Sequence, residues 1–317
     1  MSNYRIIDRL QLDSAAERQA LIAGLLVNPA MIPPKYFYDE LGCALFCAIC
    51  ELPEYYPTRT EVAIFREHRQ DIALAAGTGK QFVDLGAGDC CKAASWLPYF
   101  QPRRYLAVDI ARAPINKALS GLAPEFPEIE MLGIVTDFAR ALDLHADLRD
   151  EPATFFYPGS SIGNFSPAEA LAFLVQIRGH CPTRGSGLLI GVDAKKDKRR
   201  LEAAYDDAVG VTAAFNRNVL VHVNRLLGSD FRPAAFEHRG LYNEVAGRIE
   251  MHLEARADQT VNIAGRVRNF GAGERILTEY SYKYAPEEFE ALLRRAGFGD
   301  IRVWQDAERE FSVFYAE

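Results

Sequence analysis

A glycine turn directly after a predicted strand is the stretch best suited to chemistry on a ligand. Residues 82–85 form an apolar run with one acid, and they lead into Gly86-Ala87-Gly88, where the backbone can pass close to a nucleotide. A dinucleotide fingerprint would place a third glycine at position 91, but Cys91 stands there. The turn therefore favours a ligand with a single nucleoside.

Three acids follow predicted strands at the rhythm of a parallel sheet. Asp84 belongs to the first strand, Asp109 ends a second at 105–109, and Asp137 lies in a third at 133–138. Because the ends of parallel strands meet along one edge, we expect the three acids to converge near the glycine turn. An acid about 20 residues after the glycines is placed to bind a ribose diol. The alternative interpretation is an α/β domain with ordinary strand-end acids.

Length and charge restrict the class of protein. The chain has 317 residues, is 49% hydrophobic and carries a net charge of −7, which indicates a well-cored globular protein and argues against a nucleic-acid partner. Neither a signal peptide nor an apolar run of about 18 residues is present, so we expect no membrane segment and a cytoplasmic location.

Six cysteines are too few for a disulfide framework in a chain of this length. Cys43, Cys47 and Cys50 have a spacing that could hold a metal, but they fall in an amphipathic helical pattern and no second Cys or His pair follows. We therefore expect free thiols and no metal.

The order of predicted elements indicates an α/β fold with an insertion. Helices are predicted over residues 9–28, 43–50, 62–76, 90–100, 113–121, 169–178 and 286–296, and further strands over 153–157 and 187–193. Between 196 and 278 the pattern changes to two helices and the antiparallel strands 248–255 and 259–263. The first fold resumes with a strand at 278–284, and two last strands lie around Val303 and Val313. Tyr55 and Tyr56, bracketed by prolines, are expected in a loop.

The three strand ends together resemble the class I S-adenosylmethionine-dependent methyltransferases. A more specific resemblance, over nearly the whole chain, is to the L-histidine Nα-methyltransferases of ergothioneine biosynthesis. It is carried by residues 36–39, 52–59, 159–164, 204–216 and 278–281. The block 204–216 is the most specific of these.

The resemblance implies a class I (Rossmann-like) methyltransferase sheet with an inserted α+β substrate-binding domain. The cofactor domain would comprise 62–195 and 279–317, and the substrate domain 1–61 and 196–278. The implied reaction is trimethylation of the α-amino group of L-histidine to hercynine by S-adenosylmethionine, without a metal, in a protein that we expect to be a monomer.

The family's site residues carry over to matching positions of this chain. The cofactor would be bound by Gly86, Gly88, Lys92, Asp109, Asp137 and Phe138, and histidine by Phe46, Tyr55, Gly159, Asn164, Tyr205, Glu279 and Ser281. Tyr38 and Asn164 are the predicted catalytic residues, Tyr38 as a relay for the amine proton. Two departures from the family pattern are the loop residues 89–91, which could change cofactor affinity, and Pro158.

The residue types suit the implied substrate on physical grounds. The carboxylate of a free amino acid needs hydrogen-bond donors, which Asn164 and Tyr205 supply, and an imidazole needs partners on both nitrogens, which Glu279 and Ser281 supply. Taken alone, Glu279-x-Ser281 also fits an exposed edge strand.

Two other functions compete with histidine methylation. Another aromatic amino acid, such as tryptophan, could be the substrate, although a carboxylate facing an indole would be poorly paired. A non-catalytic module that binds histidine or a nucleotide is the alternative outside the enzymes.

Overall fold

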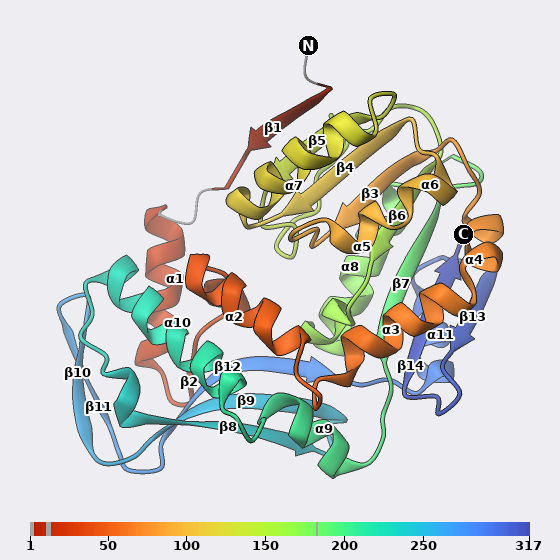
Figure 1. Cartoon of the computed structure of the whole chain (residues 1–317). Coiled ribbons are helices and arrows are strands. Elements are labelled where there is room, and N and C mark those ends of the chain that lie inside the picture. The colour runs from red at the N-terminus through yellow and green to blue at the C-terminus, as the bar shows by residue number, and fades with distance from the viewer. Residues whose placement is uncertain (1–2, 11–13, 182) are drawn as a thin grey trace. The chain divides into compact units, whose positions relative to one another are not determined.

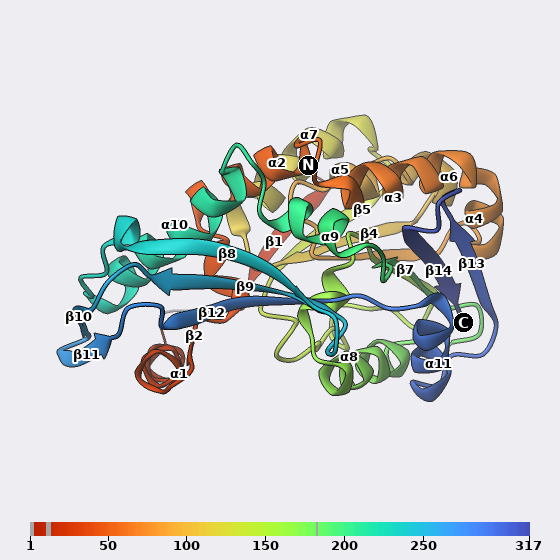
Figure 2. The same ribbon diagram turned by 90° about the horizontal axis from the view of Figure 1, so that it is seen from below.

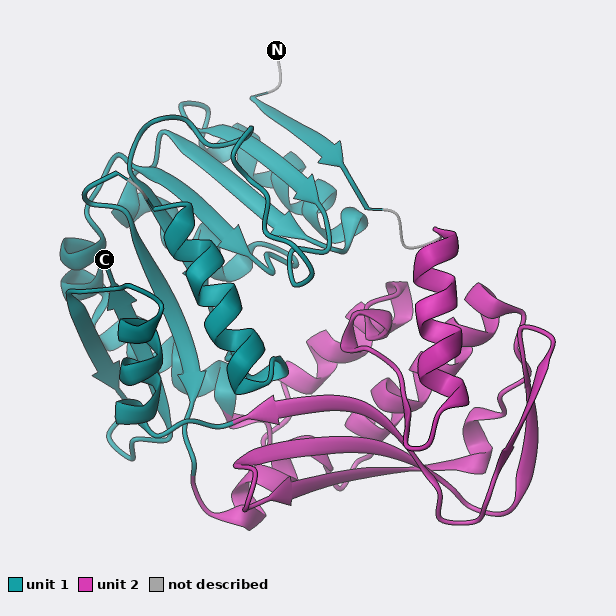
Figure 3. Cartoon of the chain, turned by 180° about the vertical axis from the view of Figure 1, so that it is seen from behind, with its two compact units in different colours: residues 1–10, 57–195, 283–317 teal, residues 11–56, 196–282 magenta. Residues whose placement is uncertain are grey.

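The computed structural model describes residues 3–10, 14–181 and 183–317. The chain divides into two compact units, shown in Figure 3. Unit 1 comprises residues 1–10, 57–195 and 283–317, and unit 2 comprises 11–56 and 196–282. Each unit has its own hydrophobic core and its own sheet.

These boundaries differ from the predicted domains at three short segments. Residues 1–10 and 57–61 belong to unit 1, and residues 279–282 belong to unit 2. The first difference arises because an N-terminal strand pairs with the large sheet. The assignment of cofactor binding to one unit and substrate binding to the other stays a prediction.

Within the described residues, unit 1 contains an eight-stranded sheet in the order β1-β5-β4-β3-β6-β7-β14-β13 (Figure 1). The strands are β1 (Tyr4–Asp8), β3 (Gln81–Leu85), β4 (Arg104–Asp109), β5 (Glu130–Val135), β6 (Ala153–Tyr157), β7 (Gly187–Asp193), β13 (Ile301–Gln305) and β14 (Phe311–Ala316). In this order the neighbouring strands from β1 to β7 pair in parallel, and β14 runs antiparallel to both β7 and β13. The strands of the parallel part are buried almost throughout, which is typical of a sheet covered on both faces.

Helices cover both faces of this sheet. They are α3 (Tyr56–Glu67), α4 (Arg69–Ala76), α5 (Cys91–Ala94), α6 (Leu97–Phe100), α7 (Arg112–Glu125), α8 (Pro167–Gly179) and α11 (Pro286–Arg295), with a short 3-10 helix η2 (Ser161–Asn164). Figure 2 shows α3 and α7 on one face and α8 and α11 on the other. Ser166 and Glu169 form a capping box that starts α8, with Pro167 at its first position.

Unit 2 pairs an antiparallel-rich sheet with a helical layer. Its strands are β2 (Ala30–Met31), β8 (Phe236–Asn243), β9 (Arg248–Ala255), β10 (Gln259–Ile263), β11 (Arg266–Phe270) and β12 (Arg275–Tyr282). Its helices are α1 (Ala15–Leu26), η1 (Pro34–Phe37), α2 (Glu40–Cys50), α9 (Lys198–Tyr205), α10 (Val211–Leu227) and η3 (Pro233–Ala235). One sheet has the order β2-β12-β9-β8, and β10 and β11 form a separate hairpin.

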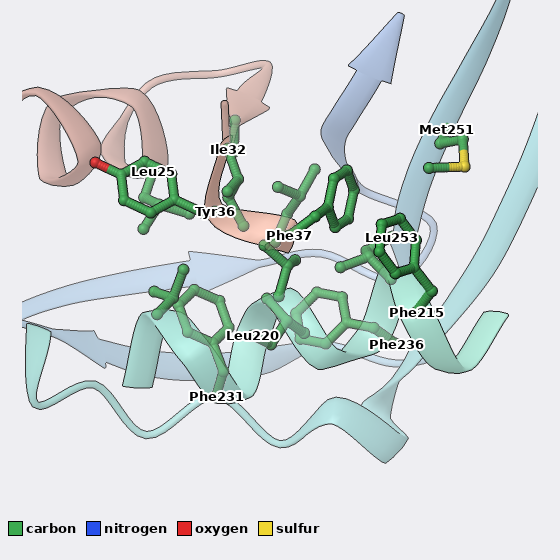
Figure 4. Packing of buried hydrophobic residues seen from close by; sticks show 14 of the residues in the cluster. Leu25, Ile32, Tyr36, Phe37, Phe215, Leu220, Phe231, Phe236, Met251 and Leu253 are labelled. Atoms are coloured by element: carbon green, nitrogen blue, oxygen red, sulfur yellow. The ribbon is translucent and has the colours of Figure 1, made fainter. Parts of the chain in front are cut away.

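The core of unit 2 lies between this sheet and α10 (Figure 4). β9 alternates strictly between buried and half-buried residues, because only one of its faces packs on the helices. Phe37 of η1 stacks on Phe215 of α10, with ring centroids 4.5 Å apart. Asp207 accepts hydrogen bonds from three backbone N–H groups at the start of α10, at 2.7 to 3.0 Å, and so caps this helix.

Several local predictions are confirmed. The strands 153–157, 187–193, 248–255 and 259–263 have the predicted bounds, and the helices at 169–178 and 286–296 agree within one or two residues. The predicted helix 62–76 is instead two helices that break at His68. The predicted helix 9–28 begins only at Ala15, where Ser14 accepts the N–H of Glu17, and residues 11–13 lie outside the described part.

Two predictions are wrong because distant pairing decides them. The strand predicted at 278–284 does not rejoin the first sheet: β12 lies between β2 and β9 in unit 2. The loop predicted around Tyr55 and Tyr56 is wrong for Tyr56, which begins α3; Tyr55 lies in the loop before this helix, and both rings are buried. β1, β8 and β11 are strands that the sequence interpretation did not include.

Candidate active site

The glycine turn and Asp109 meet at the carboxyl end of β3 and β4. Gly86 and Gly88 both have left-handed backbone angles, with φ of 73° and 53°, which only glycine adopts readily. The Asp109 carboxylate accepts the backbone N–H of Gly88 at 2.8 Å through Oδ2 and that of Ala111 at 2.8 Å through Oδ1. Asp109 therefore holds the turn in shape, and each oxygen keeps a further lone pair for a diol.

Burial raises the pKa of Asp109, and the backbone N–H groups of Ala111, Gly88 and Ile110 lower it. A carboxylate in this setting is a strong acceptor, because its charge is poorly solvated and compensated chiefly by N–H dipoles.

Asp84 lies on β3, the strand that pairs with the strand of Asp109. Its side chain is 2% exposed and accepts the hydroxyl of Tyr105 at 2.8 Å. Burial raises the pKa of Asp84 to about 7. Asp84 thus lies within electrostatic range of Asp109 and Asp89, whose charges also raise its pKa, but its side chain is buried in the sheet and bound to Tyr105.

Asp137 and Phe138 follow β5 at the same edge of the sheet. Asp137 Oδ1 accepts the N–H of Arg140 at 3.3 Å. The Phe138 ring lies edge-on to Tyr157, with centroids 6.0 Å apart, and a Cβ on Gly86 would lie 3.8 Å from it. An acid and a flat ring beside the glycine turn are suited to the polar edge and the face of a purine.

The altered part of the loop forms a tight connection. Cys90 has a left-handed φ of 59° and is buried, and Asp89 accepts the N–H of Cys91 at 3.1 Å. The chain thus enters α5 directly after the glycine turn and presents Lys92 one residue later.

A buried carboxylate links Lys92 to the loop after β6. Glu61 on α3 is 0% exposed, and its Oε2 lies 2.5 Å from Lys92 Nζ. Its other oxygen accepts the N–H of Gly159 at 2.7 Å. Gly191 on β7 makes room for this carboxylate, since a Cβ there would lie 1.9 Å from Glu61 Oε1.

Sequence reasoning did not assign Glu61 to the site. The available signal was its spacing: Glu61, Ile64 and Phe65 stand at i, i+3 and i+4 on one helix face, and the two apolar members are buried. An acid on an apolar helix face must find a partner in the interior.

The loop from Gly159 to Asn164 is held at its start. Gly159 has a φ of 77°, and Ser160 has a φ of 58° while its hydroxyl accepts the N–H of Asp193 at 2.9 Å. Asn164, at the end of η2, is half-buried, and its side chain makes no hydrogen bond to the residues that the structure describes. Its amide is thus available to a ligand.

In unit 2, the structure brings together six residues that were predicted for the histidine site: Tyr38, Phe46, Tyr55, Tyr205, Glu279 and Ser281. Tyr38, Phe46, Tyr55 and Tyr205 form a continuous series of ring contacts, with successive centroids 6.0, 6.4 and 6.0 Å apart. The Tyr205 hydroxyl is hydrogen-bonded to Ser281 Oγ at 2.9 Å.

Glu279 lies close enough to Tyr55 for its charge to act on the Tyr55 hydroxyl. Burial raises the pKa of Tyr55 well above its ordinary value, and the nearby Tyr205, Cys50, Glu279 and Tyr38 raise it further. Tyr55 is therefore a neutral phenol, able to donate a hydrogen bond.

A β-bulge sets the position of Glu279 on β12. The register with β9 shifts between Leu277 and Glu279, so Thr278 is an extra residue. Glu279 is 9% exposed and Ser281 3%. The pair therefore does not form the exposed edge alternation that the sequence alone allowed.

The predicted site residues form two groups, each described within its own unit. Gly159 and Asn164 belong to unit 1 with the cofactor residues, and the aromatic and hydroxyl residues with Glu279 belong to unit 2. The roles of all of them stay predictions.

In the described part of the chain, the cysteines are free thiols and no group of three or more His, Cys, Asp or Glu side chains is arranged to hold a metal ion. Among the same residues, none of the helices has the length and apolar character needed to span a membrane.

Comparison with known proteins assigns this chain to a family. A family described as histidine-specific, S-adenosylmethionine-dependent methyltransferases matches residues 17–317. The chain belongs to this family.

Individual relatives agree with this assignment. The chain is 41% identical to the histidine N-alpha-methyltransferase of Mycolicibacterium smegmatis, over 100% of this chain and 98% of the relative. It is 37% identical to the protein of that name from Mycobacterium tuberculosis, over 95% and 94%. It is 27% identical to ergothioneine biosynthesis protein 1 of Schizosaccharomyces pombe, over 89% of this chain and 38% of that longer protein.

Proposed function

We propose that this protein transfers three methyl groups in succession from S-adenosylmethionine to the α-amino nitrogen of L-histidine and forms hercynine, a step of ergothioneine biosynthesis. The family and the relatives named above support this reaction. The structural observation that carries it is the buried group of Glu279, Ser281 and Tyr205 beside aromatic rings. A carboxylate and a hydroxyl among rings suit an imidazole, which is flat and has a polar atom on two sides.

In this proposal some predicted residues bind the cofactor and others bind histidine, and Tyr38 and Asn164 are catalytic, Asn164 being also one of the histidine-binding residues. The cofactor is bound by Gly86, Gly88, Lys92, Asp109, Asp137 and Phe138, and histidine by Phe46, Tyr55, Gly159, Asn164, Tyr205, Glu279 and Ser281. Asp109 takes the ribose hydroxyls, and Phe138 takes the face of the adenine. Asn164 and Tyr205 take the substrate carboxylate.

S-adenosylmethionine supplies a methyl group that its sulfonium activates for attack. A new N–C bond forms as the S–C bond breaks, so the amine needs a free lone pair and must lose a proton before each transfer. The protein contributes by orienting the amine and by stripping water from it. Tyr38 relays the released proton, and no strong general base is required.

The main competing substrate is tryptophan or another aromatic amino acid, because the groups that bind an amino acid's amine and carboxylate would serve any of them. Glu279 favours an imidazole over an indole, since an imidazole has two ring nitrogens that can form hydrogen bonds and an indole has one. A module that only binds histidine or a nucleotide would show binding without product.

The decisive experiment is a mass-spectrometric assay of the purified protein with S-adenosylmethionine and each aromatic amino acid in turn. We expect histidine to gain one, two and finally three methyl groups, and tryptophan to gain none at a comparable rate. If tryptophan alone gives a methylated product, the substrate is tryptophan. If histidine binds and no product forms, the protein is a binding module. The monomeric state, the cytoplasmic location and the absence of metal, nucleic-acid and membrane partners stay predictions.

A further inference from the structure

Two buried polar side chains of unit 2 lie behind Tyr205, one on α10 and one on β8. Asn216 is fully buried and His238 nearly so. The Asn216 amide nitrogen lies 2.8 Å from His238 Nδ1, and His238 Nε2 lies 2.8 Å from the backbone oxygen of Tyr205. Neither Asn216 nor His238 belongs to the proposed histidine-binding set.

The hydrogen bonds determine which nitrogen of His238 carries the proton. The carbonyl of Tyr205 can only accept, so Nε2 must be the donor. The Asn216 amide also reaches the backbone oxygen of His252 at 3.1 Å, so its nitrogen is the end that faces both groups. Nδ1 must then accept from Asn216, and a second proton at Nδ1 would break that bond.

The charges around His238 agree with a neutral ring. Burial lowers the pKa of His238, the carbonyl of Tyr205 and the carboxylates of Asp206 and Asp207 raise it, and Arg217 lowers it. Asp206 is the nearest acid, with Oδ1 3.8 Å from Nε2.

This pair holds the backbone of Tyr205. Tyr205 is the last residue of α9, where helix carbonyls have no partner within the helix, and His238 supplies one. Gly240 on β8 permits the close approach, because a Cβ there would lie 2.6 Å from the Tyr205 oxygen. The side chain of Tyr205 is held at its other end by Ser281.

We propose that His238, oriented by Asn216, is a positioning residue for substrate recognition: it fixes the end of α9 so that the Tyr205 hydroxyl meets the amino-acid substrate. The inference rests on the proposed function, in which Tyr205 binds histidine. His238 acts through Tyr205 and touches neither substrate nor cofactor.

Two matched variants separate the two nitrogens of His238. In His238→Gln the amide can reach the place of Nε2 and keep the hydrogen bond to the Tyr205 carbonyl. In His238→Asn it can reach only the place of Nδ1 and keep the contact with Asn216. We expect His238→Asn to raise KM for histidine about tenfold, as the loss of one buried hydrogen bond does, and His238→Gln to stay within about twofold of the parent.

A double-mutant cycle with Tyr205→Phe tests the route of the effect. If His238 acts by placing the Tyr205 hydroxyl, His238→Asn should change KM by less than about twofold when that hydroxyl is already absent. A purely structural effect would instead persist in the Tyr205→Phe background. Asn216→Ala removes the group that selects the tautomer of His238, and it should raise KM for histidine less than His238→Asn does. If His238→Asn fails to fold, Asn216→Ala provides the same test.

Calorimetric affinity for S-adenosylmethionine, expected to be unchanged, reports that each variant is folded. Equal KM values for the Asn and Gln variants, or full additivity with Tyr205→Phe, would overturn this inference alone. Absence of histidine methylation by the parent protein would overturn it together with the proposed function.

Discussion

The carboxylate of Glu61 and the ammonium of Lys92 lie 2.5 Å apart in unit 1, and they differ sharply in their access to water. Glu61 is fully buried, whereas the Lys92 side chain is 30% exposed. The second oxygen of Glu61 accepts the N–H of Gly159. The pair therefore joins a cofactor-binding candidate and a substrate-binding candidate through one residue that the sequence did not assign.

Substitutions of Lys92 and of Glu61 should lower the free energy of unfolding by different amounts. Lys92→Met leaves a buried carboxylate without its counter-ion and should destabilise the fold by about 3 to 5 kcal/mol. Glu61→Gln leaves a half-buried ammonium that water can reach, and should cost about 1 to 3 kcal/mol. Denaturant unfolding measures both. The double variant should be more stable than Lys92→Met alone, and a Lys92→Met protein as stable as the parent would show that the pair does not form in solution.

Asp109→Ala should weaken S-adenosylmethionine binding, because a charged acceptor for ribose hydroxyls contributes about 1.5 to 3 kcal/mol per hydrogen bond. Calorimetry on a variant with a native circular dichroism spectrum is the measurement. Asp109→Asn is the matched control, since it can keep one acceptor for the N–H of Gly88, and it should lose less affinity. Unchanged affinity in a folded Asp109→Ala protein would remove Asp109 from the cofactor site.

Asn164→Ala and Tyr205→Phe should each raise KM for histidine and leave the affinity for S-adenosylmethionine nearly unchanged. Each loses one hydrogen bond to the substrate carboxylate, which corresponds to about a tenfold change for a charged acceptor. Steady-state kinetics with histidine, paired with calorimetry for the cofactor, separates the two effects. Loss of cofactor binding alone in both variants would mean that the carboxylate site lies elsewhere.

Glu279→Ala should change substrate choice. A site built around a polar partner can discriminate by about 10⁴-fold against analogues that lack it, whereas an apolar pocket achieves far less. We therefore expect kcat/KM for histidine to fall steeply and that for tryptophan to rise or hold. Glu279→Gln, similar in shape but uncharged, should have a kcat/KM for histidine between those of the parent and Glu279→Ala. A constant ratio of the two substrates in all three proteins would show that Glu279 does not contact the imidazole.

Asp84 should make folding stability depend on pH. Burial raises the pKa of Asp84 to about 7 in the folded protein, well above its unfolded value, so the folded state binds the proton more tightly. Its contribution is present below the unfolded pKa of about 3.9 and is lost as the pH rises toward 7, by about 4 kcal/mol in all. Asp84→Asn should flatten the stability profile between pH 4 and 7. A parent and variant with parallel profiles would contradict this.

Local patterns were enough to determine much of unit 1. The glycine turn, the strand that ends at Asp109 and the capped helix that begins after Ser166 depend on backbone angles and neighbours a few residues away. Because such features depend only on nearby residues, they can be predicted from a single sequence.

Only the tertiary structure decided which distant segments meet. The pairing of β12 with β9, rather than with the large sheet, and the burial of Asp84 depend on contacts that alternation and spacing do not encode.

The same holds for the residues that support the site. Glu61 on α3 needs Gly191 on β7 to have room, and His238 needs the end of α9 and Asn216 on α10 to have partners. The sequence determined the kinds of groups available for chemistry, because residue type alone states what can donate, accept or carry charge. Their placement required the fold, because burial and hydrogen-bond partners come from segments far apart in the chain.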